Sequence, residues 1–92
     1  MDKKLPISCP SCSAGLKVKS LYCENCETTI TGQFELPVLL RLEPREQNFI
    51  LDFIQCSGSL KLMASKLNLS YPTVRNMLDD LIGKIKNLQH HD

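Results

Sequence analysis

The 92-residue sequence lacks several features that would place it in familiar functional classes. It has no apolar run of about 18 residues, the length that a membrane-spanning helix needs. Its first residues, MDKKLPISCP, contain no apolar stretch typical of a secretory signal. We therefore expect a cytoplasmic protein, in a reducing compartment where structural disulfides are rare. No paired carboxylates, nucleophile–base arrangement or glycine-rich phosphate loop indicates an enzyme, and we expect none.

Acidic residues are also missing from one long segment. The chain as a whole carries a formal net charge of only +1, but residues 53–78 contain no aspartate or glutamate. Asp52 and Asp79 bracket this segment. Its cations are Lys61, Lys66 and Arg75. A locally basic segment in a near-neutral chain favours contact with an anion, although ordinary surface charge gives the same pattern.

Cysteine is the most informative residue type that the chain does contain. Four of the five cysteines form two Cys-x-x-Cys pairs in the stretch CPSCSAGLKVKSLYCENC. The paired residues are Cys9, Cys12, Cys23 and Cys26. A disulfide framework, a redox motif and a metal site compete to explain them. The reducing compartment and the odd fifth cysteine count against disulfides, and the lack of a helix beside either pair counts against a thioredoxin-like motif.

Structural zinc fits the two pairs best. Zinc binds four thiolates at tetrahedral corners, which leaves no open position for a catalytic water. Alternation over residues 16–19 and the β-branched run 28–34 each predict a strand after a pair, as in a zinc ribbon. The ribbon has few apolar residues, so metal binding would supply most of its folding free energy. Ser13 and Glu27 follow the pairs where such turns often have glycine, so we expect some strain there.

Other potential ligands have simpler interpretations. His90 and His91 lie near the C-terminus, where we expect a solvated tail. Cys56 follows the apolar residues 49–54, and we expect a buried core thiol, because no partner base suggests a nucleophile.

The second half of the chain has helical patterns. Pro44 suits the first turn of a helix whose apolar stripe includes Phe49 and Phe53. Gly58 is placed to end that helix, and Ser59 is placed to cap the next one.

The stretch SLKLMASKLNLSYPTVRNM predicts a helix-turn-helix. We expect a helix over residues 60–67, a left-handed Asn68, and Ser70 as the N-cap of a helix from Tyr71 to about Asn87. The small Ala64 would allow close approach of the helices. The residues expected to fill the angle between them are Met63, Leu67, Leu69, Val74 and Met77.

A helix-turn-helix presents the N-terminal residues of its second helix to base edges in the major groove. The residues expected there are Tyr71, Thr73, Arg75 and Asn76. Arginine pairs bidentately with guanine and asparagine with adenine. Lys61, Lys66 and Ser70, with the helix amides, are expected to reach phosphates. A helical hairpin with no nucleic-acid role would have the same apolar positions, so that alternative stays open.

The last helix extends beyond what the motif needs. Its apolar residues have the spacing of a coiled-coil seam, although over only about two heptads and with Gly83 among them. They are Val74, Leu78, Leu81, Ile85 and Leu88. Either Val74 to Leu81 pack on the first helix and the rest of the seam covers the ribbon, or the seam forms a homodimer through the C-terminal helix.

Three segments together resemble a prokaryotic family of small uncharacterised proteins that join an N-terminal zinc ribbon to a sigma-factor-like helix-turn-helix. They are the cysteine pairs, the run from Ile30 to Phe34 (ITGQF) and the run from Ser70 to Asn76 (SYPTVRN). The resemblance covers roughly residues 7–85 and implies a DNA-binding regulator. It implies metal positions at Cys9, Cys12, Cys23 and Cys26, and recognition positions at Tyr71, Thr73, Arg75 and Asn76. Glu43 departs from the Ser or Thr cap that many members have before the proline.

The sequence therefore predicts an α+β chain with two modules. Residues 1–40 would form a β zinc ribbon with its linker, and residues 41–92 an all-α helix-turn-helix module. The leading function is a transcriptional regulator that contains structural Zn²⁺ and binds double-stranded DNA. The alternative is an adaptor that contacts RNA polymerase or another regulator without reading DNA. A third interpretation, a thiol oxidoreductase or redox sensor, is supported only by the Cys-x-x-Cys spacing.

Overall fold

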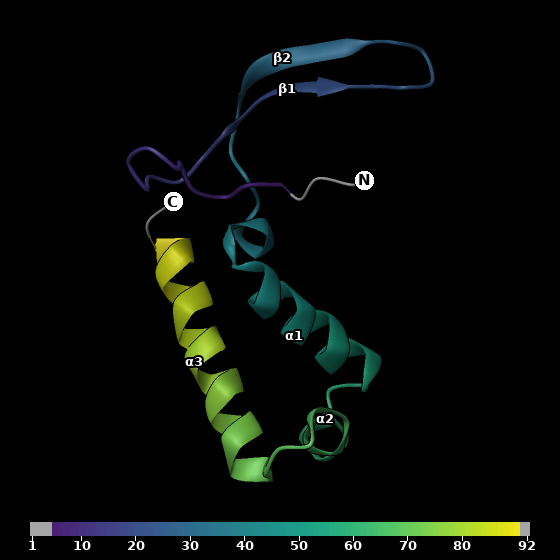
Figure 1. The fold of residues 1–92 in the computed structure, drawn as a ribbon, viewed down its shortest axis with the longest axis vertical. Coiled ribbons are helices and arrows are strands. Elements are labelled where there is room, and N and C mark those ends of the chain that lie inside the picture. The colour runs from purple at the N-terminus through teal and green to yellow at the C-terminus, as the bar shows by residue number, and fades with distance from the viewer. Residues whose placement is uncertain (1–4, 91–92) are drawn as a thin grey trace. The chain divides into compact units, whose positions relative to one another are not determined.

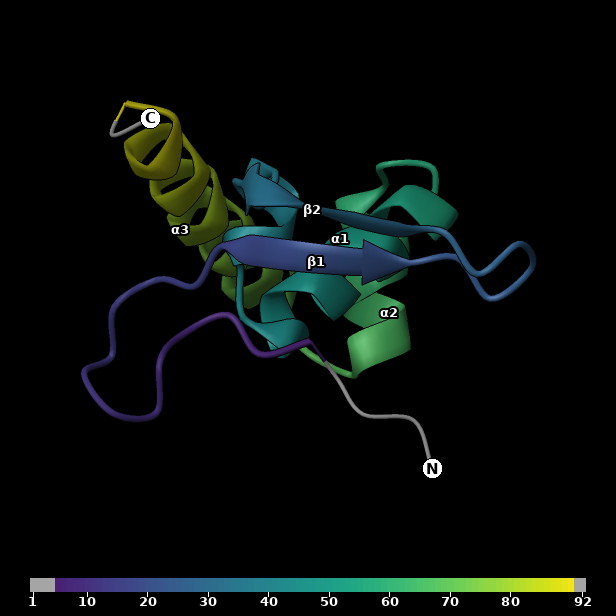
Figure 2. The same ribbon diagram turned by 90° about the horizontal axis from the view of Figure 1, so that it is seen from above.

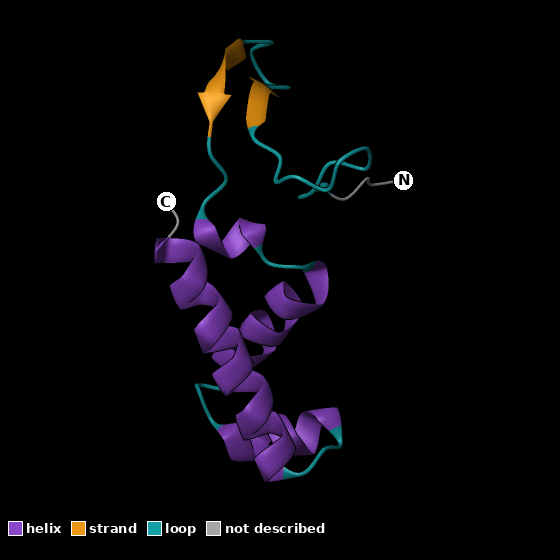
Figure 3. Cartoon of the chain, turned by 90° about the vertical axis from the view of Figure 1, so that its left-hand side faces the viewer, coloured by secondary structure: helices purple, strands orange, loops and turns teal. Residues whose placement is uncertain are grey.

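The structure is a computed structural model that describes residues 5–90. The chain divides into two compact units, Met1–Arg41 and Leu42–Asp92. Figure 3 shows the strands in the first unit and helices α1 to α3 in the second. No helix among the described residues has both the length and the apolar character to cross a membrane. His90 is the exposed last residue of α3, and His91 lies outside the described residues.

The first unit is built on one antiparallel hairpin. Strand β1 (Val18–Tyr22) pairs with β2 (Thr29–Phe34), with Leu21 opposite Ile30 and a bulge between Val18 and Ser20 (Figures 1 and 2). A single bridge between Ser8 and Gly15 closes the turn that precedes β1. The β-branched residues of β2 favour this pleated conformation, and the strand predicted over residues 28–34 is confirmed. Strand β1 begins two residues later than the alternation over residues 16–19 predicted and extends to Tyr22.

Little apolar surface is buried in this unit. Among residues 5–41, Leu36 alone is buried, with 5% of its surface exposed. The facing pair Leu21 and Ile30 each remain 53% exposed. A two-stranded hairpin is at best marginally stable in water, so the unit needs another source of folding free energy. After β2, the 3-10 helix η1 (Val38–Arg41) ends the unit, and the Arg41 side chain donates to the Leu36 carbonyl at 2.8 Å.

The second unit contains three helices with clear end signals. Helix α1 (Pro44–Gln55) begins at its proline, and Glu46 accepts the Glu43 amide at 2.8 Å. The capping oxygen therefore comes from the third helical residue, which explains how the helix starts without a Ser or Thr before Pro44. Gly58 follows α1 with a φ of +75°. The Ser59 hydroxyl then caps α2 (Leu60–Leu67) by accepting the Leu62 amide at 3.2 Å.

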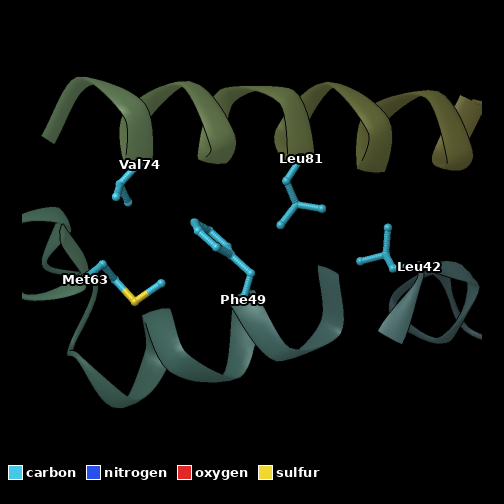
Figure 4. Close-up of a cluster of buried hydrophobic side chains, with 5 residues drawn as sticks. All are labelled: Leu42, Phe49, Met63, Val74 and Leu81. Atoms are coloured by element: carbon cyan, nitrogen blue, oxygen red, sulfur yellow. The ribbon is translucent and has the colours of Figure 1, made fainter. Parts of the chain in front are cut away.

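The core of the second unit forms where the three helices meet. Phe49 projects from α1 toward α3, whose Val74 and Leu81 point back at it, and Met63 of α2 closes one side (Figure 4). Leu42 completes the cluster, and Leu42, Met63 and Val74 are fully buried. Of the residues expected to fill the angle of the helix-turn-helix, Met63, Val74 and the half-buried Leu67 do so. Leu69 and Met77 were assigned wrongly, since 42% and 39% of their surfaces are exposed.

Helix α3 (Tyr71–His90) uses its apolar seam inside the unit. Val74 and Leu81 are buried in the core, and Leu78, Ile85 and Leu88 are partly buried against it. All five seam residues thus pack, fully or in part, on the helices of their own unit, and Ile85 and Leu88, which the sequence suggested would cover the ribbon, contact this core. Cys56 is half-buried and packs on the same cluster, as expected of a core thiol.

Candidate metal centre and nucleic-acid interface

Each cysteine pair forms the same tight turn. The amide of Ser13 donates to the Cys9 carbonyl at 2.8 Å, and the amide of Glu27 donates to the Cys23 carbonyl at 2.8 Å. Ser13 and Glu27 adopt left-handed backbone conformations, with φ of 65° and 62°. A β-carbon disfavours this conformation, which glycine adopts at no steric cost. The strain expected directly after each pair is confirmed.

One sulfur in each turn accepts hydrogen bonds that favour the thiolate. The amide of Cys12, and then that of Ser11 at 3.4 Å from the sulfur, lower the pKa of the Cys9 thiol below 9.0. The hydroxyl of Thr28, 3.0 Å from the Cys26 sulfur, and then its amide lower the pKa of the Cys26 thiol. Since the thiolate is the form that binds metal, both turns are suited to a metal ion.

The two turns lie at opposite ends of the segment that contains β1. Within each turn, one thiol also lowers the pKa of the other: Cys12 lowers that of Cys9, and Cys23 lowers that of Cys26. Within residues 5–90, no group of three or more His, Cys, Asp or Glu side chains is close enough to hold a metal ion. The donor chemistry of four thiols in two matched turns fits Zn²⁺. Binding by all four requires the two turns to meet.

The helix-turn-helix in the second unit has the predicted local geometry. Asn68 ends α2 in the left-handed conformation, with φ of 57° and ψ of 43°. The next amide, that of Leu69, donates back to the Ala64 carbonyl at 3.0 Å. The Ser70 hydroxyl accepts the Thr73 amide at 3.3 Å and so caps the start of α3. The turn and the helix start are confirmed, and α3 runs three residues beyond the predicted end at Asn87.

All four residues expected to read bases are exposed on the first two turns of α3. They are Tyr71, Thr73, Arg75 and Asn76. Arg75 and Asn76 follow the buried Val74 directly, so they lie on the sides of the helix away from the core. The Thr73 hydroxyl lies 2.7 Å from the Ser70 hydroxyl and takes part in the cap. Tyr71 and Asn76 therefore have the freest side-chain ends, because Arg75 pairs with Asp79.

The basic segment is less basic in space than in sequence, because the two acids that bracket it pair with its cations. Lys66 Nζ lies 3.0 Å from Asp52 Oδ1, and this hydrogen bond raises the pKa of Lys66. Arg75 Nε lies 3.4 Å from Asp79 Oδ1. For Lys61, the described residues provide no ion pair. Lys61 is therefore the cation best placed to reach a phosphate, whereas Lys66 would have to share its charge with Asp52.

The N-terminus of α3 has few amides left for a phosphate. Pro72 has no N–H, the Thr73 amide donates to the Ser70 hydroxyl, and the Val74 amide donates to the Ser70 carbonyl at 3.1 Å. The sequence suggested that the amides at this helix end bind phosphate. Of these amides, only those of Ser70 and Tyr71 are left for that role.

Sequence reasoning missed three residues that contact the expected site residues. Asp79 lies four residues after Arg75 on one helix, a spacing that the sequence displays. The contact of Thr28 with Cys26 was also open to inference, because they are two residues apart in one turn. The pairing of Asp52 with Lys66 was not, because it joins different helices across 14 residues.

A hairpin with two cysteine turns, followed by a helix-turn-helix, is the module arrangement typical of a small nucleic-acid-binding regulator. Residues 9–39 match the family model described as DUF2089 zinc ribbon, and residues 42–88 match the one described as Domain of unknown function (DUF2089)-HTH. The chain therefore belongs to the DUF2089 family, and the predicted order of ribbon and helix-turn-helix is confirmed. The ribbon match, with its two cysteine pairs, fits a structural Zn²⁺. No curated protein and no solved structure matches the chain.

Proposed function

We propose that this protein is a zinc-stabilised transcriptional regulator that reads double-stranded DNA with the first turns of α3. The observation that carries the proposal is the helix-turn-helix geometry at Asn68 and Ser70, which leaves the base-reading side chains exposed. Arg75 would pair with guanine, Asn76 with adenine, and Tyr71 and Thr73 would contact neighbouring positions. Lys61, Lys66 and Ser70 would contact phosphates and fix the register of the helix.

The ribbon would contribute stability to this regulator. Cys9, Cys12, Cys23 and Cys26 are the proposed ligands of one structural Zn²⁺, which closes the first unit by joining its two turns. With Leu36 as the one buried apolar residue among residues 5–41, metal binding would supply most of that unit's folding free energy. A reducing cytoplasm would keep these thiols available to the metal.

The experiment that tests the proposal is selection of bound duplexes from a randomised DNA pool, using zinc-loaded protein. We expect an enriched motif and a strong fall in affinity as salt increases. An inverted repeat would indicate a dimer, and a single half-site would indicate a monomer. Absence of any enriched sequence would contradict the proposal.

Single variants then test the residue roles on the selected duplex. Arg75→Ala or Asn76→Ala should each cost about 1–3 kcal/mol of binding and relax one base position. Lys61→Ala should weaken all sequences alike and reduce the salt slope by about one. Lys86→Ala, which removes an exposed cation from the C-terminal half of α3, is the matched control and should change neither measurement.

A protein-interaction adaptor is the second candidate, because apolar side chains remain exposed on the helical unit. Leu51 and Ile54, one turn apart on α1, are 58% and 67% exposed. We would test RNA polymerase as the partner, with purified enzyme after nuclease treatment. Direct binding that Leu51→Glu with Ile54→Glu abolishes would favour this function. Binding of DNA alone, unchanged in the same double variant, would favour the regulator.

A further inference from the structure

The contact between Arg75 and Asp79 involves one specific nitrogen of the guanidinium. The nearest approach is Nε of Arg75 to Oδ1 of Asp79, at 3.4 Å. Within residues 5–90 the guanidinium has no other ion-pair or hydrogen-bond partner, so its two terminal nitrogens remain available. The side chains are 54% and 51% exposed, so the pair lies at the surface of the helix that the proposed function places in the major groove.

Guanine offers two acceptors, O6 and N7, to a pair of parallel donors. The terminal nitrogens of an arginine held at Nε provide such a pair, in one plane and pointing one way. A free arginine can instead swing to a phosphate, which carries no sequence information. A carboxylate at Nε therefore favours base reading over phosphate contact.

We propose that Asp79 is a positioning residue for DNA recognition, which holds Arg75 end-on toward guanine. The inference rests on the proposed function, because it concerns the same face of α3. Asp79 also places a negative charge beside the groove, so it disfavours non-specific approach of phosphates. Its effect is on selectivity more than on affinity.

The magnitudes are compatible with this role. A surface pair four residues apart on a helix stabilises its geometry by only about twofold. A bidentate arginine–guanine contact discriminates against the wrong base by roughly 5- to 150-fold. Loss of Asp79 therefore leaves the fold intact, and it lowers the base preference by no more than the roughly twofold by which the pair holds Arg75 in place.

The neighbouring Asp80 provides a matched control. It is exposed, carries the same charge on the same helix, and forms no ion pair within residues 5–90. Asp79→Asn and Asp80→Asn each remove one negative charge, so both should raise non-specific affinity similarly. Only Asp79→Asn removes the partner of Arg75.

The test is to measure affinities for the selected duplex, for the same duplex with each base substituted in turn, and for unrelated DNA. We expect Asp79→Asn to lower the preference for guanine opposite Arg75 by about twofold, with an unchanged melting temperature. Asp79→Glu, which keeps a carboxylate at the same spacing, should restore much of the preference. Asp80→Asn should leave that preference unchanged.

The outcomes separate the inference from the function on which it rests. If Asp79→Asn keeps the base preference, or if Asp80→Asn changes it equally, Asp79 does not position Arg75 and the proposed function still stands. If Arg75→Ala leaves the preference at every position unchanged, the positioning role also fails. If the wild-type protein selects no sequence, the proposed function itself fails, and the inference fails with it.

Discussion

The carboxylate of Glu46 accepts a 2.7 Å hydrogen bond from Lys84 Nζ and thereby joins the first turn of α1 to α3. The same oxygen, Oε1, accepts the Glu43 amide at 2.8 Å. One carboxylate thus caps a helix and fixes the approach of a second helix to it. Its side chain is 21% exposed and that of Lys84 is 39% exposed, so the pair is only partly screened by water.

Replacement of Glu46 should destabilise the helical unit more than replacement of Lys84. Glu46→Ala removes both the cap and the ion pair, and we expect a loss of about 1–2 kcal/mol. Lys84→Ala removes the pair alone, and we expect about 0.5 kcal/mol. Urea unfolding followed by far-UV circular dichroism measures both, with Lys86→Ala as a control that should stay within about 0.5 kcal/mol. Equal losses at Glu46 and Lys84 would show that the cap contributes nothing.

Stability should depend on the ionisation of Glu46. Burial raises its pKa, but the hydrogen bond from Lys84 and the Glu43 amide outweigh burial, so the net pKa is lowered from 4.5. Because the pKa is lower in the folded state, the stabilisation is complete above the unfolded value and is lost as pH falls through the folded one. Glu46→Gln should therefore flatten the acid limb of stability against pH below about pH 5. An unchanged acid limb in this variant would contradict the role of Glu46.

The helical unit could be predicted almost completely because its signals are local. Ser59, Asn68 and Ser70 set helix ends through contacts within a few residues, so the chain displays them directly. The positions of Leu69 and Met77 could not be predicted, because the exposure of a residue beside a turn depends on how the helices cross.

The exposure of the candidate site residues could be predicted from the sequence, but their electrostatics could not. The absence of acids over residues 53–78 indicated a basic surface, yet Asp52 and Asp79 lie one residue outside the segment and neutralise Lys66 and Arg75. A linear count of charges ignores contacts between helices and between successive turns. For the same reason, the sequence could not tell that Ile85 and Leu88 pack, in part, on the core of the helical unit.

Removal of zinc should unfold the first unit and spare the second. The described part of the first unit buries one apolar residue, Leu36, whereas α1 to α3 enclose their own core. A chelator should therefore abolish the dispersed amide resonances of residues 5–41 in NMR spectra while the helical circular dichroism persists. Thiol titration provides the count: four additional thiols should react after chelation, and Cys56 should react slowly before and after. Loss of the helical signal with the metal would show that the second unit depends on the ribbon.

Glycine after each cysteine pair should strengthen metal binding. Ser13 and Glu27 have positive φ, so Ser13→Gly and Glu27→Gly each relieve a strain of about 1 kcal/mol. Since folding of the unit is coupled to metal binding, each variant should bind Zn²⁺ roughly fivefold more tightly. Competition with a chromophoric chelator measures the affinity. Ser11→Gly, in the first turn but without a positive φ, is the control and should not increase it.

Alanine at Gly83 should stabilise α3, because a β-carbon there would meet no atom within 4 Å. Glycine costs about 1 kcal/mol relative to alanine inside a helix, so Gly83→Ala should raise the free energy of unfolding by about that amount. Gly58→Ala is a control with the opposite expected sign. The φ of +75° at Gly58 is unfavourable for any residue with a side chain, so this variant should be less stable. Thermal unfolding at two protein concentrations measures both. A destabilised Gly83→Ala whose melting temperature depends on concentration would show that a second copy packs closely on that face of α3, contrary to the open space in this structure.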